Sequence, residues 1–575
     1  MRSYLSLLLL FLLILSNCKN STSPNDGEDL NGYNETGFFK TDGTLILNRQ
    51  GEAVQIKGFG LGGWLLPEGY MFNITHPAGE GATEIYEQIE RVLGAADTKE
   101  WIKQFRDNFV TEEDIKTMKE WGADHIRVPF HYNLFYDIDK GEFIDEGFDR
   151  IDELLIWCKR NRVDVILDMH AAPGAQSDGP IADSDGTARF WTESDTYWPI
   201  TIKIWEKLAN RYKNETIIIG YDLLNEPVTP SPYSNIDLAK FYSQIIPAVR
   251  KIDKNHILFI EGNYYATTFD HLMPPMDDNM VYAFHKYWNE TDQGTIQYLV
   301  NISNQYNVPL WLGESGENSN PWFYETIALM EANNIGWNWW THKKLETITA
   351  PFSAPSNSGY DAVLAYWKGE GPAPSAQEAK DGLFKMVEDL KSENCDFRPD
   401  VVASLFSPTF GSENEPYTEL TIPGQIDAVL YDIGYEGVSY HDSEYKRVSS
   451  NNNQNTGNNG WSFRNDGVDI ERSDDPRTEY NIGWTDDGEW LEYTVTITAG
   501  TYNMEARVAS PNGQGSIRLF LDDTEIIETT YVPSTGGYQN WQQMELGSYT
   551  FPAGTHILKV AFPNGGFNFS KLLIE

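Results

Sequence analysis

The chain has 575 residues, of which 40% are hydrophobic and 13% aromatic, which is enough apolar material for two domains with separate cores. The 85 Asp and Glu residues exceed the 43 Lys and Arg residues and give a net charge of −42, a field that repels nucleic-acid phosphates. We therefore exclude nucleic acid as a partner and expect a neutral or weakly charged ligand. The aromatic share fits either core packing or platforms that stack against sugar rings.

Residues 1–17 have the pattern of a signal peptide that precedes a lipid-modified cysteine. Arg2 supplies the positive start, and Leu5–Leu15 form an apolar core that is too short to span a membrane stably. The segment Leu15–Cys18 resembles the cleavage box of a bacterial lipoprotein, although Asn17 replaces the usual Gly or Ala. By this resemblance Cys18 carries the lipid that anchors the protein to the outer cell membrane. The alternative is a secretory peptide cleaved nearby, and both alternatives place the mature protein outside the cytoplasm.

The polar residues 18–37 predict a flexible tether, and ordered structure is expected from residue 38. The two remaining cysteines are Cys158, which lies in an apolar helical pattern and is expected to be a buried thiol, and Cys395. Whether these two form a disulfide is left open by the sequence.

Residues 38–395 alternate apolar strands with amphipathic helices, and eight such units predict a (β/α)8 TIM barrel. Ile217–Glu226 is an apolar, β-branched run without alternation, as in a parallel strand covered on both faces. Pro227 cannot continue the strand, so Glu226 should lie at its carboxyl end. The eight expected strands are Ile56–Leu65, His125–Phe130, Val163–Ala172, Ile217–Glu226, His256–Gly262, Met280–Trp288, Pro309–Glu314 and Gly336–Thr341.

The remaining chain divides into a linker and a second domain. Residues 396–418 are polar and rich in turn formers, which predicts an interdomain linker. Residues 419–575 contain short strands separated by Gly, Asn and Asp clusters, for example Trp490–Val495. This texture predicts an all-β jelly roll or β-sandwich.

Several polar and aromatic residues lie near the carboxyl ends of the expected barrel strands, where a parallel barrel brings side chains into one pocket. Taken singly, each has a structural alternative, such as an ion-pair partner for Arg127, a satisfied core histidine for His170 or core packing for Trp340. Eight of them in register on the strand ends are hard to explain by chance. They are Arg127, His170, Asn225, Glu226, His285, Tyr287, Glu314 and Trp340.

Six segments of the expected barrel resemble glycoside hydrolase family 5, a large retaining family that includes cellulases and exo-β-1,3-glucanases. They are Gly122–Pro129, Leu167–Gly174, Leu224–Pro227, His285–Trp288, Leu312–Glu314 and Gly336–Trp340. The resemblance implies that Glu226 is the general acid/base and Glu314 the nucleophile. In such enzymes the two carboxyl groups lie about 5–5.5 Å apart.

The same resemblance implies supporting roles for the other residues of the set. Arg127 and Tyr287 would favour the charged form of Glu314, and Asn225 would bind the sugar 2-hydroxyl. His170 and His285 would position sugar hydroxyls or the acid/base, and Trp340 would lie beneath the reacting ring.

A hint about the substrate comes from Gly60–Tyr70, which resembles the first-strand segment of the exo-β-1,3-glucanase branch. In that branch a Trp-Leu-x-x-Glu stretch contacts the terminal glucose. Glu68 is therefore expected to bind sugar, and its alternative is an ordinary carboxylate of a surface loop.

The C-terminal domain resembles carbohydrate-binding module family 6 in Ile422–Ala428, Tyr480–Trp484, Gly488–Tyr493, Pro533–Trp541 and Phe567–Asn568. Such modules hold a sugar between two loop aromatics with an Asn hydrogen bond, which implies Trp484, Trp541 or Tyr538, and Asn568 here. Core packing is the alternative for Trp541. The family usually binds a structural calcium through Glu-x-Glu, where this chain has Gln425-Ile426-Asp427, one charge fewer.

Together these features predict a retaining glycoside hydrolase that cleaves the β-1,3 or β-1,4 bonds of a β-glucan polysaccharide or oligosaccharide. No cofactor is expected for catalysis. Mannan or xylan could replace glucan, because fold does not determine substrate. The alternative from another class is a catalytically silent glycan-binding protein of the cell surface, which would be expected to lack at least one carboxylate. Linkage, and endo or exo action, stay open.

Overall fold

The computed structural model describes residues 35–445, 448–449, 455–456 and 459–575. The predicted signal peptide, Cys18 and most of the predicted tether lie outside the described residues. Within the described ranges, no helix has both the length and the apolar character needed to cross a membrane.

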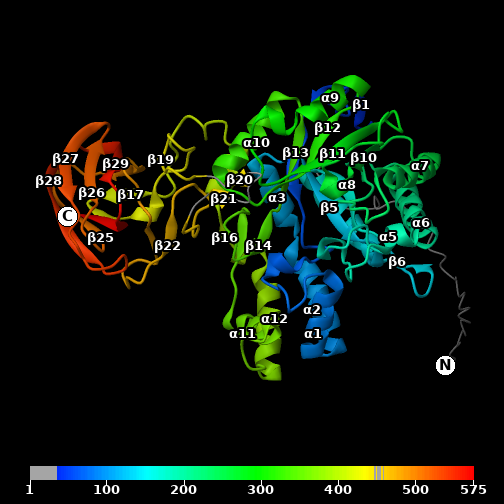
Figure 1. Ribbon diagram of the computed structural model, residues 1–575, viewed down its shortest axis with the longest axis horizontal. Coiled ribbons are helices and arrows are strands. Elements are labelled where there is room, and N and C mark those ends of the chain that lie inside the picture. The colour runs from blue at the N-terminus through cyan, green and yellow to red at the C-terminus, as the bar shows by residue number, and fades with distance from the viewer. Residues whose placement is uncertain (1–34, 446–447, 450–454, 457–458) are drawn as a thin grey trace, which may run out of the picture.

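Eight parallel strands close into a barrel, which confirms the predicted TIM barrel (Figure 1). Their side chains are almost all buried, as expected for strands covered on both faces. The barrel closes where β13 pairs with β4. In chain order the strands are β4 (Lys57–Gly60), β5 (His125–His131), β8 (Asp164–Ala171), β9 (Ile218–Asp222), β10 (Ile257–Glu261), β11 (Met280–Lys286), β12 (Leu310–Gly316) and β13 (Gly336–Trp340).

Helices connect the strands around the outside of the barrel. Helix α3 begins with a capping box in which the Thr111 hydroxyl accepts from the amide of Asp114, and the Asp114 carboxylate accepts from the amide of Thr111. Cys158 is buried in α4, Cys395 is half-buried, and neither is in a disulfide. The connecting helices are α3 (Glu112–Trp121), α4 (Glu146–Asn161), α5 (Arg189–Thr192), α6 (Ser194–Tyr212), α7 (Asn235–Ile252), α8 (Asn263–Ala266), α9 (Gln297–Tyr306) and α10 (Asn320–Ala332).

Two additions extend the barrel. The first is a small sheet of β1 (Lys40–Asp42), β2 (Leu45–Leu47) and β3 (Ala53–Val54). Ile46 of this sheet and Phe39, directly before it, pack against apolar side chains of the barrel strands. Four helices form a bundle at one side of the barrel, the lower part of Figure 1. They are α1 (Ala82–Leu93), α2 (Ala95–Phe109), α11 (Ser358–Lys368) and α12 (Ala376–Asp389).

The prediction of a linker at 396–418 is wrong for most of that range. Strand β16 (Asp396–Phe397) pairs with β15 (Phe352–Ala354), and α13 (Pro399–Phe406) buries Val401 and Leu405 in the core of the barrel. Phe410 is also buried. The segment resembles a linker in sequence because α13 is short and polar, turn-forming residues flank it on both sides.

The C-terminal domain is a sandwich of two sheets, which confirms the all-β prediction (Figure 1). Strand β24 alternates buried and partly exposed side chains, so one face lies in the core and the other meets solvent. One sheet contains β17 (Leu420–Ile422), β24 (Trp490–Ile497), β29 (Gly554–Asn564), β26 (Ser516–Leu521), β27 (Thr524–Tyr531) and β19 (Tyr440–His441). The other contains β22 (Ile470–Arg472), β23 (Tyr480–Ile482), β30 (Asn568–Ile574), β25 (Gly500–Ala509), β28 (Gln542–Phe551) and β18 (Gly424–Asp427).

Candidate active site

A cavity of about 540 Å³ opens at the carboxyl ends of the barrel strands. Seven of the residues singled out from the sequence line it: Glu68, His170, Glu226, His285, Tyr287, Glu314 and Trp340. Arg127 and Asn225 do not reach the cavity. Both are completely buried behind it, so this geometry does not bring Asn225 to a sugar hydroxyl, and Arg127 can act only through the residues that it contacts.

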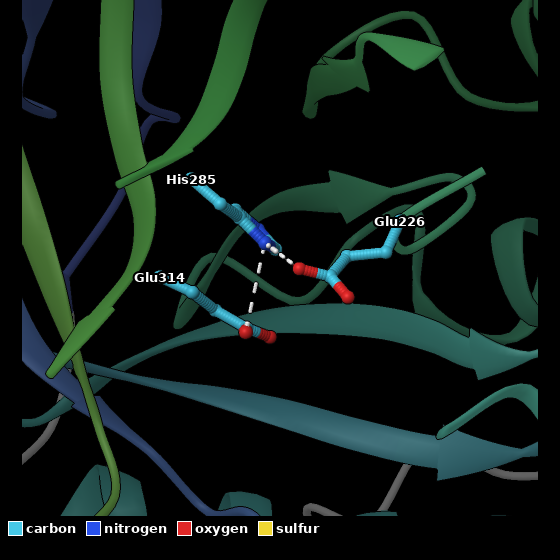
Figure 2. A group of neighbouring side chains, drawn as sticks. All are labelled: Glu226, His285 and Glu314. Carbon is cyan, nitrogen blue, oxygen red and sulfur yellow. Dashed lines mark hydrogen bonds and ion pairs between the residues drawn. The ribbon is translucent and has the colours of Figure 1, made fainter. Parts of the chain in front are cut away.

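Two carboxylates face each other across one imidazole in this cavity, as Figure 2 shows. Glu226 follows β9 and Glu314 lies within β12. Nδ1 of His285 lies 2.7 Å from Oε1 of Glu226 and 3.6 Å from Oε2 of Glu314. One oxygen of each carboxylate and the imidazole all lie within 4.8 Å of one another. This spacing suits an attacking carboxylate and a proton donor on one glycosidic bond, and it is shorter than the roughly 6.5–9.5 Å found where a water lies between the two carboxyl groups.

The charge of His285 is determined by the acidic groups around it. Burial alone would lower its pKa, but the carboxylates of Glu261, Glu314 and Glu226 raise the pKa well above the ordinary value for histidine. Nε2 of His285 lies 3.2 Å from Oε1 of Glu261. The surrounding carboxylates therefore favour the imidazolium form of His285, which places positive charge between Glu226 and Glu314.

Arg127 lies at the centre of a buried charge network beneath the cavity. Its guanidinium donates to Oε1 of Glu314 at 2.5 Å, to Asp222 at 2.9 Å and to Glu261 at 3.0 Å. It also donates to the amide oxygen of Asn225 at 2.8 Å. Asp168 forms a further ion pair with it at 3.2 Å. Five partners in different directions hold the side chain, and through it Glu314, in one orientation.

The ionisation of Glu314 reflects opposing influences. Burial raises its pKa, while the positive charges of His285 and Arg127 lower it and the neighbouring Glu226 raises it again. Arg127 thus acts in the expected direction, but burial outweighs it in this cavity. The hydroxyl of Tyr287 donates to Oε2 of Glu314 at 3.2 Å, so both carboxylate oxygens have donors.

A second group forms one wall of the cavity around His170. Its ring stacks on Trp340, with centroids 5.3 Å apart and planes 5° from parallel. Although burial opposes it, the carboxylate of Asp168, 2.7 Å from Nδ1, raises the pKa of His170 to about 10. Oε1 of Glu68 lies 3.6 Å from Nε2 of His170, and this buried oxygen has no hydrogen-bond partner. Glu68 is therefore a buried carboxylate of the cavity wall, next to His170, and not a surface-loop carboxylate.

The indole of Trp340 is positioned from two sides. Its Nε1 donates to the hydroxyl of Tyr70 at 2.6 Å. A Cβ atom at Gly62 would lie only 2.5 Å from the Trp340 ring, so this position must be glycine for the ring to lie where it does.

Four residues were missed in the sequence: Glu261, which is buried behind the cavity, and three residues that line it. Glu261 ends β10 after Ile257–Ile260, so it repeats the pattern of an apolar strand followed by a carboxylate that singled out Glu226 and Glu314. Tyr265, Trp288 and Glu317 line the cavity, but they follow no such pattern.

Left-handed backbone conformations cluster around this cavity. Glu226 has φ of 41°, Trp288 of 47° and Glu317 of 53°. The three consecutive residues Tyr264–Ala266 also have positive φ, between 55° and 58°. Such conformations cost non-glycine residues about 1–3 kcal/mol each and persist only where the surrounding contacts impose them.

The aromatics predicted to bind sugar in the second domain lie at one end of the sandwich. Trp484 is 47% exposed and Tyr538 50% exposed, whereas Trp541 is half-buried and its Nε1 donates to Gln539. Asn568 is buried, and its amide nitrogen donates to Glu471 at 2.7 Å and to the carbonyl of Tyr538 at 2.9 Å. Trp484 and Tyr538 therefore offer free ring faces, and Asn568 joins the loop of one to the strands below.

The residues at the expected calcium position do not fit a calcium ion. Nζ of Lys571 donates to Oε1 of Gln425 at 3.1 Å, and Nε2 of Gln425 donates to Asp427 at 2.6 Å. An ammonium group of the chain thus lies where a cation would bind, beside one carboxylate only. A Ca²⁺ site needs six to eight oxygen ligands.

The match to known proteins agrees with this geometry. Residues 84–345 match the model of Cellulase (glycosyl hydrolase family 5), and residues 461–574 match that of Carbohydrate binding module (family 6). Cellodextrinase A of Ruminococcus flavefaciens is 33% identical over 323 residues, which cover 50% of this chain and 89% of that protein. The chain belongs to glycosyl hydrolase family 5.

Other relatives carry different names. A beta-xylosidase of Phanerodontia chrysosporium is 33% identical over 255 residues, covering 44% of this chain and 52% of that protein. A probable glucan 1,3-beta-glucosidase A of Aspergillus fumigatus is 27% identical over 221 residues, covering 37% and 51%. The chain thus spans about half the length of these two relatives.

Proposed function

We propose that this protein is a retaining glycoside hydrolase that cleaves β-glucosidic bonds of a β-glucan by double displacement. The observation that carries the proposal is the pair Glu226 and Glu314, whose carboxylates face each other within 4.8 Å in the cavity. Relatives named as a cellodextrinase, an endoglucanase and a glucan 1,3-beta-glucosidase support glucan as the substrate.

In the first step Glu314 attacks the anomeric carbon while Glu226 donates its proton to the departing glycosidic oxygen. The C–O bond to the leaving sugar breaks as the ester bond to Glu314 forms. In the second step Glu226 takes a proton from water, which attacks the same carbon and releases Glu314. Arg127 and Tyr287 keep the two oxygens of Glu314 in the attacking orientation throughout.

The wall formed by His170, Trp340 and Glu68 would hold the sugar ring next to the reacting bond. Trp340 offers an aromatic face, and the carboxylate of Glu68 accepts from a sugar hydroxyl. The protonated His170 can only donate, so it suits a hydroxyl oxygen as its partner.

Product analysis on laminarin, lichenan, carboxymethylcellulose, mannan and xylan tests the proposal. We expect release of glucose or gluco-oligosaccharides from at least one glucan, with retention of the β configuration and no loss of rate in the presence of a chelator. Xylan is the second candidate substrate because the beta-xylosidase relative is 33% identical over its matched region. Activity on mannan or xylan alone would refute glucan as the substrate, and activity on none of the five would refute the hydrolase itself.

We also propose that the C-terminal module holds the enzyme on polysaccharide through the exposed rings of Trp484 and Tyr538, with Asn568 supporting the Tyr538 loop from beneath. Trp484→Ala should weaken retention on the insoluble form of the cleaved glucan about tenfold, because one stacked aromatic is lost. Pull-down with the insoluble glucan measures this retention. Tyr531→Ala, which removes a ring that is 71% exposed on the same module, is the matched comparison. Equal retention of both variants would contradict the proposal.

Finally, we propose that Cys18 anchors the protein to the outer cell membrane, with secretion as the alternative. The support is the resemblance of Leu15–Cys18 to a lipoprotein cleavage box. In a bacterial host the wild type should fractionate with membranes, and Cys18→Ser should release it. A wild type found only in the medium would favour secretion.

A further inference from the structure

The catalytic barrel and the carbohydrate-binding module meet through a buried polar contact directly after the strand that carries Glu314. The backbone amide of Asn320 donates to the carbonyl of Asn465 at 2.7 Å. The side-chain nitrogen of Asn465 donates to the carbonyl of Asn318 at 2.8 Å and to Oδ1 of Asn320 at 2.9 Å. All three residues are completely buried, and Asn465 is the member that belongs to the module.

Charged groups complete this contact. The side-chain nitrogen of Asn320 donates to Asp400 at 2.8 Å and to Asp466 at 2.9 Å, and Asp466 pairs with Arg464 at 2.6 Å. Because buried amides and carboxylates are costly to leave without partners, the contact is stable only while the two domains stay docked. The module is therefore a fixed part of the enzyme and not a domain on a free tether.

The contact is one residue away from the cavity wall. Glu317 precedes Asn318, and its carbonyl accepts from the indole Nε1 of Trp288 at 2.8 Å. Its carboxylate binds Lys344 at 2.6 Å. Trp288 lines the cavity and is 51% exposed, so its ring face is open to a bound sugar. Both Glu317 and Trp288 have left-handed backbones, which need outside contacts to persist.

We infer that Asn465 of the module is a positioning residue for the catalytic cavity. By bonding Asn318 and Asn320 it fixes residues 316–320, and the carbonyl of Glu317 in turn fixes the indole of Trp288. The inference rests on the proposed function, because it assigns the module a part in binding the substrate within the catalytic cavity. The module thus acts on the reaction even when no polysaccharide is present to hold.

This role differs from tethering in what it predicts for small substrates. A tether raises the local concentration of enzyme on a polymer and has no effect on a soluble tetrasaccharide. A misplaced cavity wall weakens binding of the tetrasaccharide itself. The effect should appear in KM more than in kcat, because Arg127, Tyr287 and His285 hold the reacting carboxylates from within the barrel.

The test uses the full-length chain with Asn465→Ala and, as matched control, Asn503→Ala, an exposed asparagine on β25 of the same module. Hydrogen exchange followed by mass spectrometry should show faster exchange in residues 286–290 and 315–320 for Asn465→Ala only. With cellotetraose or laminaritetraose, KM should rise about three- to tenfold, the range for losing one aromatic contact, with kcat within about twofold.

A double-mutant cycle identifies the route. Trp288→Ala should raise KM by a similar factor, and adding Asn465→Ala to it should raise KM little further, because both act on one contact. Additive effects, or an unchanged KM and exchange pattern in folded Asn465→Ala, would overturn the inference.

If Asn465→Ala does not fold, Ser319→Ala takes its place, because it removes from the same domain contact only the hydroxyl bond at 3.1 Å to the carbonyl of Tyr445. It should change KM and hydrogen exchange in the same direction, and no change in either would overturn the inference. A wild type that cleaves no glycan would refute the proposed function, while the exchange comparison would still decide the positioning role.

Discussion

Glu314→Gln should lower the rate of glycoside hydrolysis by roughly 10³-fold or more, because an amide cannot form the covalent bond to the anomeric carbon. The substitution keeps the shape of the side chain, and the amide oxygen can still accept from Arg127, which donates to Oε1 at 2.5 Å. The fold should therefore be retained. Initial rates on the preferred glucan, with circular dichroism of the same samples, measure both quantities.

The matched control is Glu120→Gln on α3, whose carboxylate is 64% exposed and remote from the cavity. It should leave the rate unchanged. Near-wild-type hydrolysis by Glu314→Gln would refute the assignment of the nucleophile.

A second substitution separates the two carboxylates by role. Glu226→Gln should lose far less activity on a 2,4-dinitrophenyl glucoside than on the glucan, because that leaving group departs without a proton. Glu314→Gln should lose activity on both substrates equally. Interchanged results would mean that the two roles are reversed.

Arg127→Met should lower the free energy of unfolding of the barrel by about 3–5 kcal/mol, because it leaves buried carboxylates without a counter-charge. Asp168, Asp222, Glu261 and Glu314 all lie within 3.2 Å of its guanidinium. Urea unfolding followed by the fluorescence of the barrel tryptophans measures the loss. The deficit should shrink as the pH falls, because unpaired buried carboxyls have raised pKa values and become protonated.

Arg91→Met is the matched control, since Arg91 forms a surface ion pair with Glu87 and its side chain is 63% exposed. It should change the free energy of unfolding by less than about 1 kcal/mol. A similar small change for Arg127→Met would mean that the buried network contributes little to stability.

The barrel and its facing carboxylates could be predicted because their signals are local. An apolar run that ends in Glu226 or Glu314 needs no knowledge of other strands, and the parallel barrel then brings such ends together. The same local signal is present at Glu261, which ends the apolar strand β10. Its role follows from its distances to Arg127 and His285, which no sequence pattern encodes.

Other features depend on contacts between distant segments and could not be derived from the sequence. Residues 396–418 resemble a linker in sequence because their apolar residues are few and scattered, and the side chains that bury Val401, Leu405 and Phe410 lie elsewhere in the chain. The docking of Asn465 on Asn318 and Asn320 joins residues about 145 positions apart. Asparagine in a Gly- and Asn-rich stretch is usually a turn residue, and nothing local distinguishes this one.

The left-handed residues around the cavity set a limit on how far this enzyme can be made heat-resistant. Glycine at Trp288, Glu317 or Tyr264 would relieve backbone strain, so a screen for thermostability alone would be drawn to these positions. Trp288 and Glu317 also shape the place where sugar is proposed to bind, and their replacement would exchange substrate affinity for stability. An engineered form is better stabilised in the four-helix bundle beside the barrel, where the chain has no such conflict.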